Sequence, residues 1–180
     1  FDGDEIEVRS LNVKKHLYWV FADLCAEKDT IKILSDLNKA YPFPTTDADR
    51  AEHEALGQQN LDIVNRAIQY MAEGDAESLG RLMTEAEAVF DEKVVPMSPA
   101  LRSPKLPRVL QDPDIQPLVW GGKGVGSHGD GSVQFLARSA EAQQQLIVYL
   151  NDHGMKAYPL TLKPVHTVRR AIIPVAGFGT

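Results

Sequence analysis

The pattern of hydrophobic and polar positions changes along the chain, and each change predicts a different element. Residues 16–24 (HLYWVFADL) form a short apolar and aromatic run bounded by charges, which predicts a strand buried on both faces. Asp29 can cap a short helix that extends to about Tyr41. Pro42 and Pro44 then end this helix, because proline has no amide hydrogen for the helical ladder.

Two long amphipathic helices are predicted next. The first begins near Asp47 and ends before Gly74, and the second begins after Asp75, whose carboxylate can cap it. The Glu-Gly-Asp connection is short, so the two helices should be antiparallel neighbours. The positions that recur at helical spacing are Leu56, Asn60, Ile63, Val64, Ala67, Ile68 and Met71 in the first helix, and Leu79, Leu82, Met83, Ala86, Val89 and Phe90 in the second.

Proline then interrupts the helical pattern. Residues 94–107 contain four prolines, too many for the interior of a helix or strand. We therefore expect an ordered loop here, followed by a short helix that ends near Leu110.

Three strands and one helix are predicted in the remainder. Residues 115–120 form a strand that leads into a glycine-rich run, and residues 133–137 alternate as the next strand. Ser139 caps a helix that Gly154 ends, and residues 158–162 alternate as the last strand. Strands paired with packed helices, without a regular βαβ repeat, indicate an α+β fold.

Composition narrows the class of protein. The 180 residues are 43% apolar and 24% charged, which is ordinary for a globular domain, and the net charge of −6 argues against nucleic acid or an anionic membrane as partner. No apolar run approaches the roughly 20 residues of a membrane-spanning helix.

Cys25 is the single cysteine, which favours a cytoplasmic setting. It lies beside an apolar run, so we expect it to be buried. The chain opens without an initiator Met or a secretory leader, and we expect it to start inside a longer protein.

The most informative stretch is the glycine-rich run at residues 120–137 (WGGKGVGSHGDGSVQFLA). Glycine allows a backbone to take a positive φ or to approach a ligand closely. Successive amides of such a run can form a nest for phosphate oxygens, and Lys123 can add a positive charge. The six glycines are Gly121, Gly122, Gly124, Gly126, Gly129 and Gly131.

Three common phosphate loops fit this run poorly. Gly124, Gly126 and Gly129 satisfy G-x-G-x-x-G, but a dinucleotide site needs a helix immediately afterwards, and the following residues alternate as a strand. A Walker A loop needs Gly-Lys-Ser/Thr at its end, which is missing. A protein-kinase glycine loop needs H-R-D and D-F-G downstream, and neither occurs. A tight hairpin whose glycines only make turns remains the alternative to a ligand-binding loop.

The run resembles the third signature motif of the GHMP kinases, roughly G-A-K-x-x-G-x-G-x-G-G, which lies between two strands. Gly121, Lys123, Gly126, Gly129 and Gly131 match it, and Gly122 takes the small-residue position. His128 and Asp130 depart from it, and Asp130 would repel an anion unless it faced away or toward Mg²⁺. The resemblance covers residues 16–162. It implies a phosphate- or substrate-binding loop made of Gly121, Gly122, Lys123, Gly124, Gly126, Ser127, His128, Gly129, Asp130 and Gly131.

The same resemblance implies a fold and a cofactor. Residues 1–162 would form an α+β domain with a ferredoxin-like antiparallel sheet covered by helices, as in the C-terminal half of these kinases. In that family the N-terminal half contributes the main ATP loop and the residues that activate the acceptor hydroxyl, and nothing here matches them. ATP and Mg²⁺ would serve the whole kinase, whereas we expect this fragment alone to be inactive. Its catalytic residues stay unassigned.

The last residues resemble the start of another enzyme. The segment 169–180 (RRAIIPVAGFGT) is a short apolar run followed by a glycine turn, and it is similar to the opening strand and nucleotide loop of the glucose-1-phosphate uridylyltransferases. By this resemblance Ala176, Gly177, Gly179 and Thr180 would contact UTP or another nucleoside triphosphate with its Mg²⁺. Residues 163–168 would be the linker. An accidental strand and turn is the alternative.

Together the two resemblances imply a bifunctional parent. A sugar kinase would make a sugar 1-phosphate, and the fused nucleotidyltransferase would activate it. Partners would be the missing N-terminal kinase domain, the C-terminal nucleotidyltransferase domain and a small-molecule sugar. The alternatives are a kinase-like module that only binds or assembles with the transferase, and a free-standing domain that binds a small ligand.

Other chemistry-bearing side chains have simpler interpretations. The histidines at 16, 53, 128, 153 and 166 are scattered, which argues against a metal site, and His128 is expected to be a solvated loop residue. Asp23, at a strand end, should bond a backbone amide. Trp19 and Trp120 should lie in the core. The acidic residues Asp47, Asp49, Glu52 and Glu54 are expected to form a solvated first helical turn.

Overall fold

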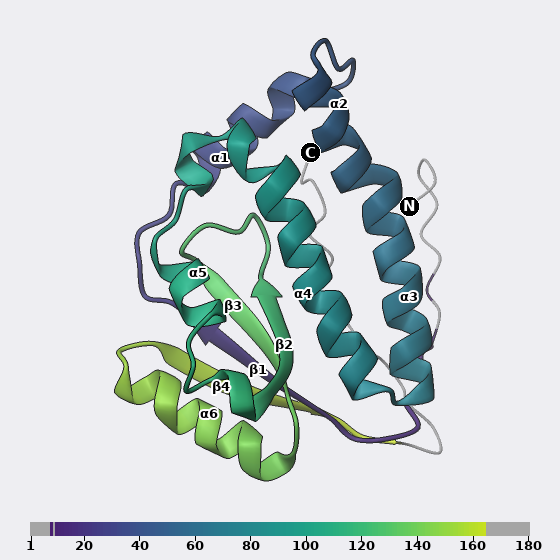
Figure 1. Ribbon diagram of the computed structural model, residues 1–180, viewed down its shortest axis with the longest axis vertical. Helices are drawn as coiled ribbons and strands as arrows, with labels where there is room; N and C mark the ends of the chain where they lie inside the picture. Colours follow the sequence, from purple (N-terminus) through teal and green to yellow (C-terminus); the bar gives the residue numbers. More distant parts are fainter. Residues whose placement is uncertain (1–7, 9, 165–180) are drawn as a thin grey trace.

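A four-stranded antiparallel sheet forms the centre of the molecule. The computed structural model describes residue 8 and residues 10–164 (Figure 1). The strands are β1 (Leu17–Asp23), β2 (Val119–Gly124), β3 (Ser132–Ala137) and β4 (Lys156–Leu162), in the order β2-β3-β1-β4. With helices between β1 and β2 and between β3 and β4, this is a β-α-β-β-α-β arrangement of the ferredoxin-like type. The predicted α+β fold is confirmed.

Helices connect and cover the strands. Within the described residues, no helix is both long and apolar enough to cross a membrane. The α-helices are α1 (Thr30–Leu37), α2 (Asp47–Glu54), α3 (Asn60–Glu73), α4 (Ala76–Lys93), α5 (Lys105–Leu110) and α6 (Ala140–Asp152). Short 3-10 turns occupy Asn38–Ala40, Val95–Met97, Pro99–Leu101 and Gln116–Leu118, and a π-type turn occupies Ala55–Gln59.

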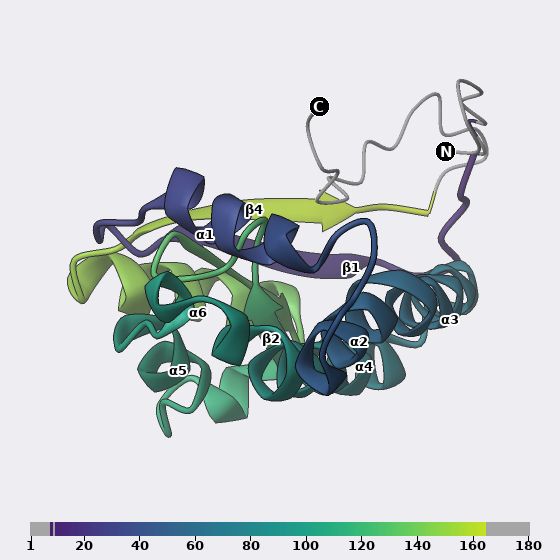
Figure 2. The same cartoon turned by 90° about the horizontal axis from the view of Figure 1, so that it is seen from above.

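The two faces of the sheet carry separate cores. Val20 of β1 and Phe135 of β3 pack with α5 and with Leu146 of α6. Trp19 and Leu136, their neighbours in sequence, pack instead with α3 and α4. Because successive side chains of a strand point to opposite faces, α6 and the α3–α4 pair cover opposite faces of the sheet. Figures 1 and 2 both show α3 and α4 side by side, with α4 next to the edge strand β2.

The predicted helix caps are confirmed. The carboxylate of Asp29 accepts a hydrogen bond from the amide of Lys32 at 2.9 Å, and that of Asp75 accepts one from Ser78 at 3.0 Å. The hydroxyl of Ser139 accepts one from Ala142 at 3.1 Å. These side chains satisfy amides that have no partner in the first helical turn.

Three local predictions are wrong. The first long helix is interrupted, because Gly57 takes non-helical angles (φ −96°, ψ −106°) between α2 and α3. The strand predicted at 115–120 begins only at Val119, since Pro117 and its neighbours form a 3-10 turn. Cys25 is exposed rather than buried, because the chain turns there with φ 51° directly after β1.

Candidate functional site

The glycine-rich run forms a hairpin at one end of the sheet. Residues 125–131 join β2 to β3, and the amide of Val125 donates to the carbonyl of Ser132 at 3.0 Å where the hairpin opens. β3 begins directly at Ser132, so no helix follows the loop. The strand–loop–strand arrangement that was predicted is therefore present, although residues 121–124 of the run are strand rather than loop.

The strand glycines are required by close packing. A Cβ atom on Gly121 would lie 1.9 Å from the carbonyl oxygen of Gly80 in α4. A Cβ on Gly122 would lie 2.4 Å from the ring of Phe135, and one on Gly124 would lie 2.5 Å from the ring of His128. These distances are far below van der Waals contact, so the three glycines let α4, β3 and the loop approach β2.

The loop contains backbone amides that have no hydrogen-bond partner among the described residues. Gly126 is exposed with φ 65°, whereas Gly129 is buried with φ 68°, and glycine adopts this left-handed conformation without a steric penalty. Among the residues that the structure describes, no hydrogen bond uses the amides of Gly126, Ser127, Gly129 or Asp130. Unpaired donors close together in sequence are one requirement of a nest for an oxyanion.

His128 is buried, in contrast to the solvated loop histidine that was predicted. Only 6% of its surface is exposed, and its ring stacks on Phe90 of α4 with 3.6 Å between centroids. Its Nε2 atom lies 3.0 Å from Oε2 of Glu87, which also accepts a hydrogen bond from the amide of Gly124 at 2.8 Å. These contacts fix the loop against α4.

The electrostatics of this cluster favour a charged Glu87. Burial opposes ionisation of its carboxyl, but hydrogen bonding and the charge of His128 outweigh burial and hold the pKa below its ordinary value. Burial lowers the pKa of Lys123, whose ammonium group donates to the carbonyl of Gly124 at 2.7 Å. The amine predicted to meet a phosphate is thus half-buried at the base of the loop, and its phosphate-binding role stays a prediction.

Asp130 faces α5. Its Oδ1 atom accepts hydrogen bonds from the amides of Lys105 at 2.9 Å and Leu106 at 2.7 Å, and from the hydroxyl of Ser103. The carboxylate is therefore satisfied by the start of a helix. The sequence left two orientations open for Asp130, away from a bound anion or toward Mg²⁺. The structure supports the first, because the carboxylate points to α5.

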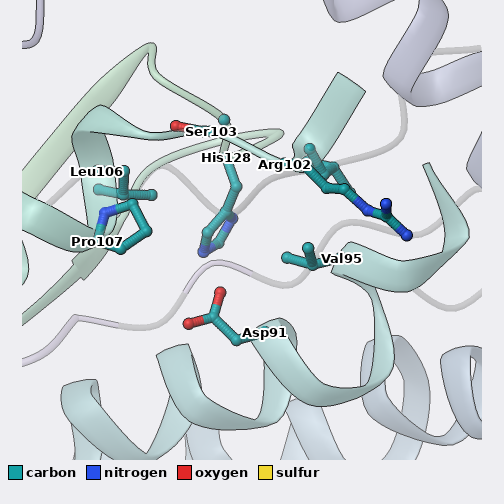
Figure 3. A pocket seen from close by; sticks show the side chains of 9 residues that line it. Asp91, Val95, Arg102, Ser103, Leu106, Pro107 and His128 are labelled. Atoms are coloured by element: carbon teal, nitrogen blue, oxygen red, sulfur yellow. The ribbon is translucent and has the colours of Figure 1, made fainter. Parts of the chain in front are cut away.

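A cavity of about 190 Å³ lies on the flank of the loop, between α4, α5 and the turn that precedes α5 (Figure 3). The Asp91 carboxylate and the His128 ring face one another across it, and Leu106, Pro107 and Val95 supply apolar walls. Burial, and then the charge of Glu87, raises the pKa of Asp91. The lining of the cavity is thus partly apolar and partly polar.

Sequence reasoning missed the acidic residues of α4. Glu87 follows Leu79 and Met83 at intervals of four, so it continues the buried row of that helix. An acidic residue on an apolar stripe needs a buried partner. The position of Glu87 in this row was therefore the sequence feature that could have predicted a buried contact. Asp91 follows at the same interval, one turn further along the helix.

The remaining candidates divide into confirmed and corrected predictions. Asp23 accepts a hydrogen bond from the amide of Cys25 at 2.8 Å, as predicted, and Trp19 is buried. Trp120 is half-buried, with the guanidinium of Arg138 4.3 Å from its ring centroid. Glu52 is fully buried rather than solvated, because it faces the core side of α2.

The predicted nucleotide contacts lie outside the described residues, as does most of the predicted linker. These contacts are Ala176, Gly177, Gly179 and Thr180.

Asp47 and Glu54 are exposed, as predicted for a solvated turn, and Asp49 forms a capping box with Thr46. No cluster of three or more His, Cys, Asp or Glu side chains that could hold a metal ion occurs in the described part of the chain. These residues therefore supply no ready-made set of ligands for an ion such as Mg²⁺.

Comparison with solved structures identifies the architecture. The mevalonate kinase of L. major, solved in complex with R-mevalonate, superposes with a TM-score of 0.65 at 18% identity, over 87% of this chain and 45% of that one. The phosphomevalonate kinase of Streptococcus pneumoniae gives 0.62 at 11% identity, over 87% and 44%. This chain shares their fold. It is the fold of the C-terminal half of GHMP kinases, as predicted.

The galactokinase of Lactococcus lactis, solved with galactose, gives a TM-score of 0.54 at 12% identity and covers 86% of this chain and 46% of its own. The chain therefore spans less than half the length of each of these kinases. No protein-family profile and no curated protein sequence matches it.

Proposed function

We propose that this chain is the C-terminal part of a GHMP-type sugar kinase, in which the 125–131 loop binds a phosphate group. The observation that carries the proposal is a loop, placed between two strands of a kinase-type domain, in which four amides have no hydrogen-bond partner in the described part of the chain. The orientation of Asp130 toward α5 supports it, because the negative charge is turned away from an incoming anion.

ATP and Mg²⁺ would be the cofactors of the complete kinase. Phosphoryl transfer depends on holding the phosphates and on neutralising the charge that develops on them. In this chain the amides of Gly126, Ser127, Gly129 and Asp130 would donate to phosphate oxygens, while the His128–Glu87 contact keeps the loop in place. The groups that activate the sugar hydroxyl would come from the upstream half, and the fragment alone would be inactive.

The fusion to a nucleotidyltransferase is part of the proposal. It rests on the amino-acid sequence of residues 169–180, which resembles the N-terminal segment of the glucose-1-phosphate uridylyltransferases. A kinase that makes a sugar 1-phosphate next to an enzyme that consumes it is chemically consistent. We infer a sugar substrate from this pairing of the two activities. Mevalonate and galactose are the ligands of the solved kinases described above.

The test is an assay of the complete parent protein. Incubation with ATP, Mg²⁺ and a panel of free sugars should release ADP with one of them, and addition of UTP should yield the corresponding nucleotide sugar. Release of ADP with mevalonate but with no sugar would contradict the sugar assignment. The absence of turnover with every substrate would overturn the kinase proposal.

A binding or assembly module is the second candidate, and one observation favours it. His128 and Asp130, the two departures from the family motif, are both used to hold the loop to α4 and α5. A loop stabilised in this way could serve recognition without catalysis. In that case the parent would transfer nucleotides to sugar 1-phosphates but would not phosphorylate free sugars.

A further inference from the structure

Lys28 lies across the glycine loop, although it is distant from it in sequence. A Cβ atom on Gly131 would lie 2.8 Å from Cδ and 3.0 Å from Nζ of Lys28, and a Cβ on Gly129 would lie 3.8 Å from its Cγ. The lysine side chain therefore runs over the end of the loop, in space that only a glycine at 131 leaves open.

The segment that carries Lys28 is anchored to the loop. The amide of Leu24 donates to the carbonyl of Gly131 at 2.9 Å, which continues the contact between β1 and β3 beyond the ends of both strands. The carbonyl of Leu24 accepts a hydrogen bond from the ammonium group of Lys105. Lys105 is thus already engaged, whereas Lys28, the neighbouring cation, has no such bond to any residue that the structure describes.

The ammonium group of Lys28 has hydrogen-bond donors that no described residue uses. Its side chain is half-buried, and within the described residues it forms no hydrogen bond or ion pair. Burial lowers its pKa, as expected for an ammonium group that has lost water without gaining an acid. Asp29, the adjacent acid, uses its carboxylate to cap α1. A partly desolvated cation without an acidic partner is stabilised by an anion that binds beside it.

We propose that Lys28 is a phosphate-binding residue of the 125–131 loop. Its ammonium group would supply the positive charge, and the loop amides would supply directional hydrogen bonds to the same phosphate group. This inference rests on the proposed function and adds a residue to it. Phosphate suits the arrangement better than a carboxylate, because it carries more charge and more acceptor oxygens for an ammonium group and several amides.

Binding of phosphate to the ¹⁵N-labelled 180-residue chain tests the inference. Inorganic phosphate should shift the amide resonances of residues 126–131 in the wild type. Lys28→Met should raise the dissociation constant by about tenfold or more, the loss expected for one charge-assisted contact. Gly131→Ala should raise it similarly, because the new methyl group displaces the lysine side chain while the backbone there can accept alanine. Parallel titrations with ADP and with glucose 1-phosphate would show whether a nucleotide or a sugar supplies the phosphate.

Lys156→Met is the matched control, since it removes the same charge from the exposed start of β4. It should change the dissociation constant less than twofold, and thermal melting should show all three variants folded. If Lys28→Met binds phosphate as tightly as the wild type, the role of Lys28 is wrong while the loop proposal stands. If phosphate fails to shift the loop amides of the wild type, the loop proposal itself is wrong and the inference fails with it.

Discussion

The Nε2 atom of His128 lies 3.0 Å from Oε2 of Glu87, and both side chains are buried. This contact joins the tip of the β2–β3 hairpin to α4 across 41 residues of sequence. Glu87 also accepts the amide hydrogen of Gly124, so one carboxylate holds both the strand end and the loop. The position of the candidate phosphate loop therefore depends on an acidic residue of a helix.

Replacement of Glu87 by Gln should destabilise the domain by about 2–4 kcal/mol at neutral pH, because His128 loses its buried acidic partner. The pKa of Glu87 in the folded state lies below its ordinary value of 4.5. Ionised Glu87 thus stabilises the fold above that pH, and this stabilisation is lost as the pH falls through the lower folded pKa. Urea unfolding from pH 3 to 7 should show this acid-side loss in the wild type and a flatter profile in the variant.

Glu85→Gln is the control for this experiment. Glu85 lies on α4, like Glu87, and forms an exposed ion pair at 2.7 Å with Arg66 of α3. Exposed pairs contribute less than about 1 kcal/mol. An effect of Glu87→Gln no larger than that of Glu85→Gln would show that the buried contact does not hold the loop.

The strand glycines should be far less tolerant than the loop glycines. Gly121→Ala places a methyl group 1.9 Å from the carbonyl of Gly80, and neither backbone can move without separating α4 from β2. We expect a loss of about 3 kcal/mol or more, at the upper end of overpacking costs. Gly126→Ala meets no atom of the described residues within 4 Å and should cost only about 1 kcal/mol for its positive φ. Thermal denaturation of both variants measures the difference, and equal effects would contradict the packing role of Gly121.

Local sequence signals predicted most of the fold. The caps at Asp29, Asp75 and Ser139 act within a single helical turn, and the apolar row of Leu79 and Met83 is a property of one helix. The end of β2, predicted at Trp120 and found at Gly124, was misplaced because Gly121 and Gly122 are poor strand residues in isolation. They are accepted in the strand only because Gly80 and Phe135 approach so closely, and that contact is distant in sequence.

The candidate site was predicted less completely, for the same physical reason. The hairpin and its glycines could be recognised from a continuous stretch. The burial of His128 could not, since it depends on Phe90 and Glu87 of a helix that packs against the loop only in the folded chain. Lys28 carries no sequence signal at all, because its relation to Gly131 follows from the pairing of β1 with β3.

Asp130 should be required for the attachment of α5. Replacement by Ala removes the acceptor for the amides of Lys105 and Leu106, which should cost about 1–3 kcal/mol, the range for orphaned partly buried donors. Hydrogen exchange should rise first at these two amides, because they lose their partner directly. Asp152→Ala, at the exposed end of α6, is the control and should leave both exchange rates unchanged. Unchanged protection in Asp130→Ala would show that α5 is held by its apolar contacts alone.

Glu52 should make the stability of the α2 region depend on pH in the opposite sense to Glu87. Its side chain is fully buried, and neither carboxylate oxygen has a hydrogen-bond partner in the described part of the chain. Burial, and then the charge of Asp49, raises the pKa of Glu52 to about 7. The fold therefore holds this proton more tightly than the unfolded chain does, so stability falls as the pH rises from about 4.5 to 7 and stays reduced above it.

Glu52→Gln should remove this cost and stabilise the protein by roughly 1–3 kcal/mol at pH 8, with little effect near pH 4. Glu54→Gln, two residues along α2, is the matched control, because that carboxylate is 65% exposed and pairs with Lys93 at 3.3 Å. Its effect should be small at both pH values. The measurement is urea unfolding of the three proteins at pH 4 and pH 8. A Glu52→Gln variant that is less stable than the wild type at pH 8 would mean that ionised Glu52 has a stabilising partner, and the assignment of a buried, proton-holding carboxyl would be wrong.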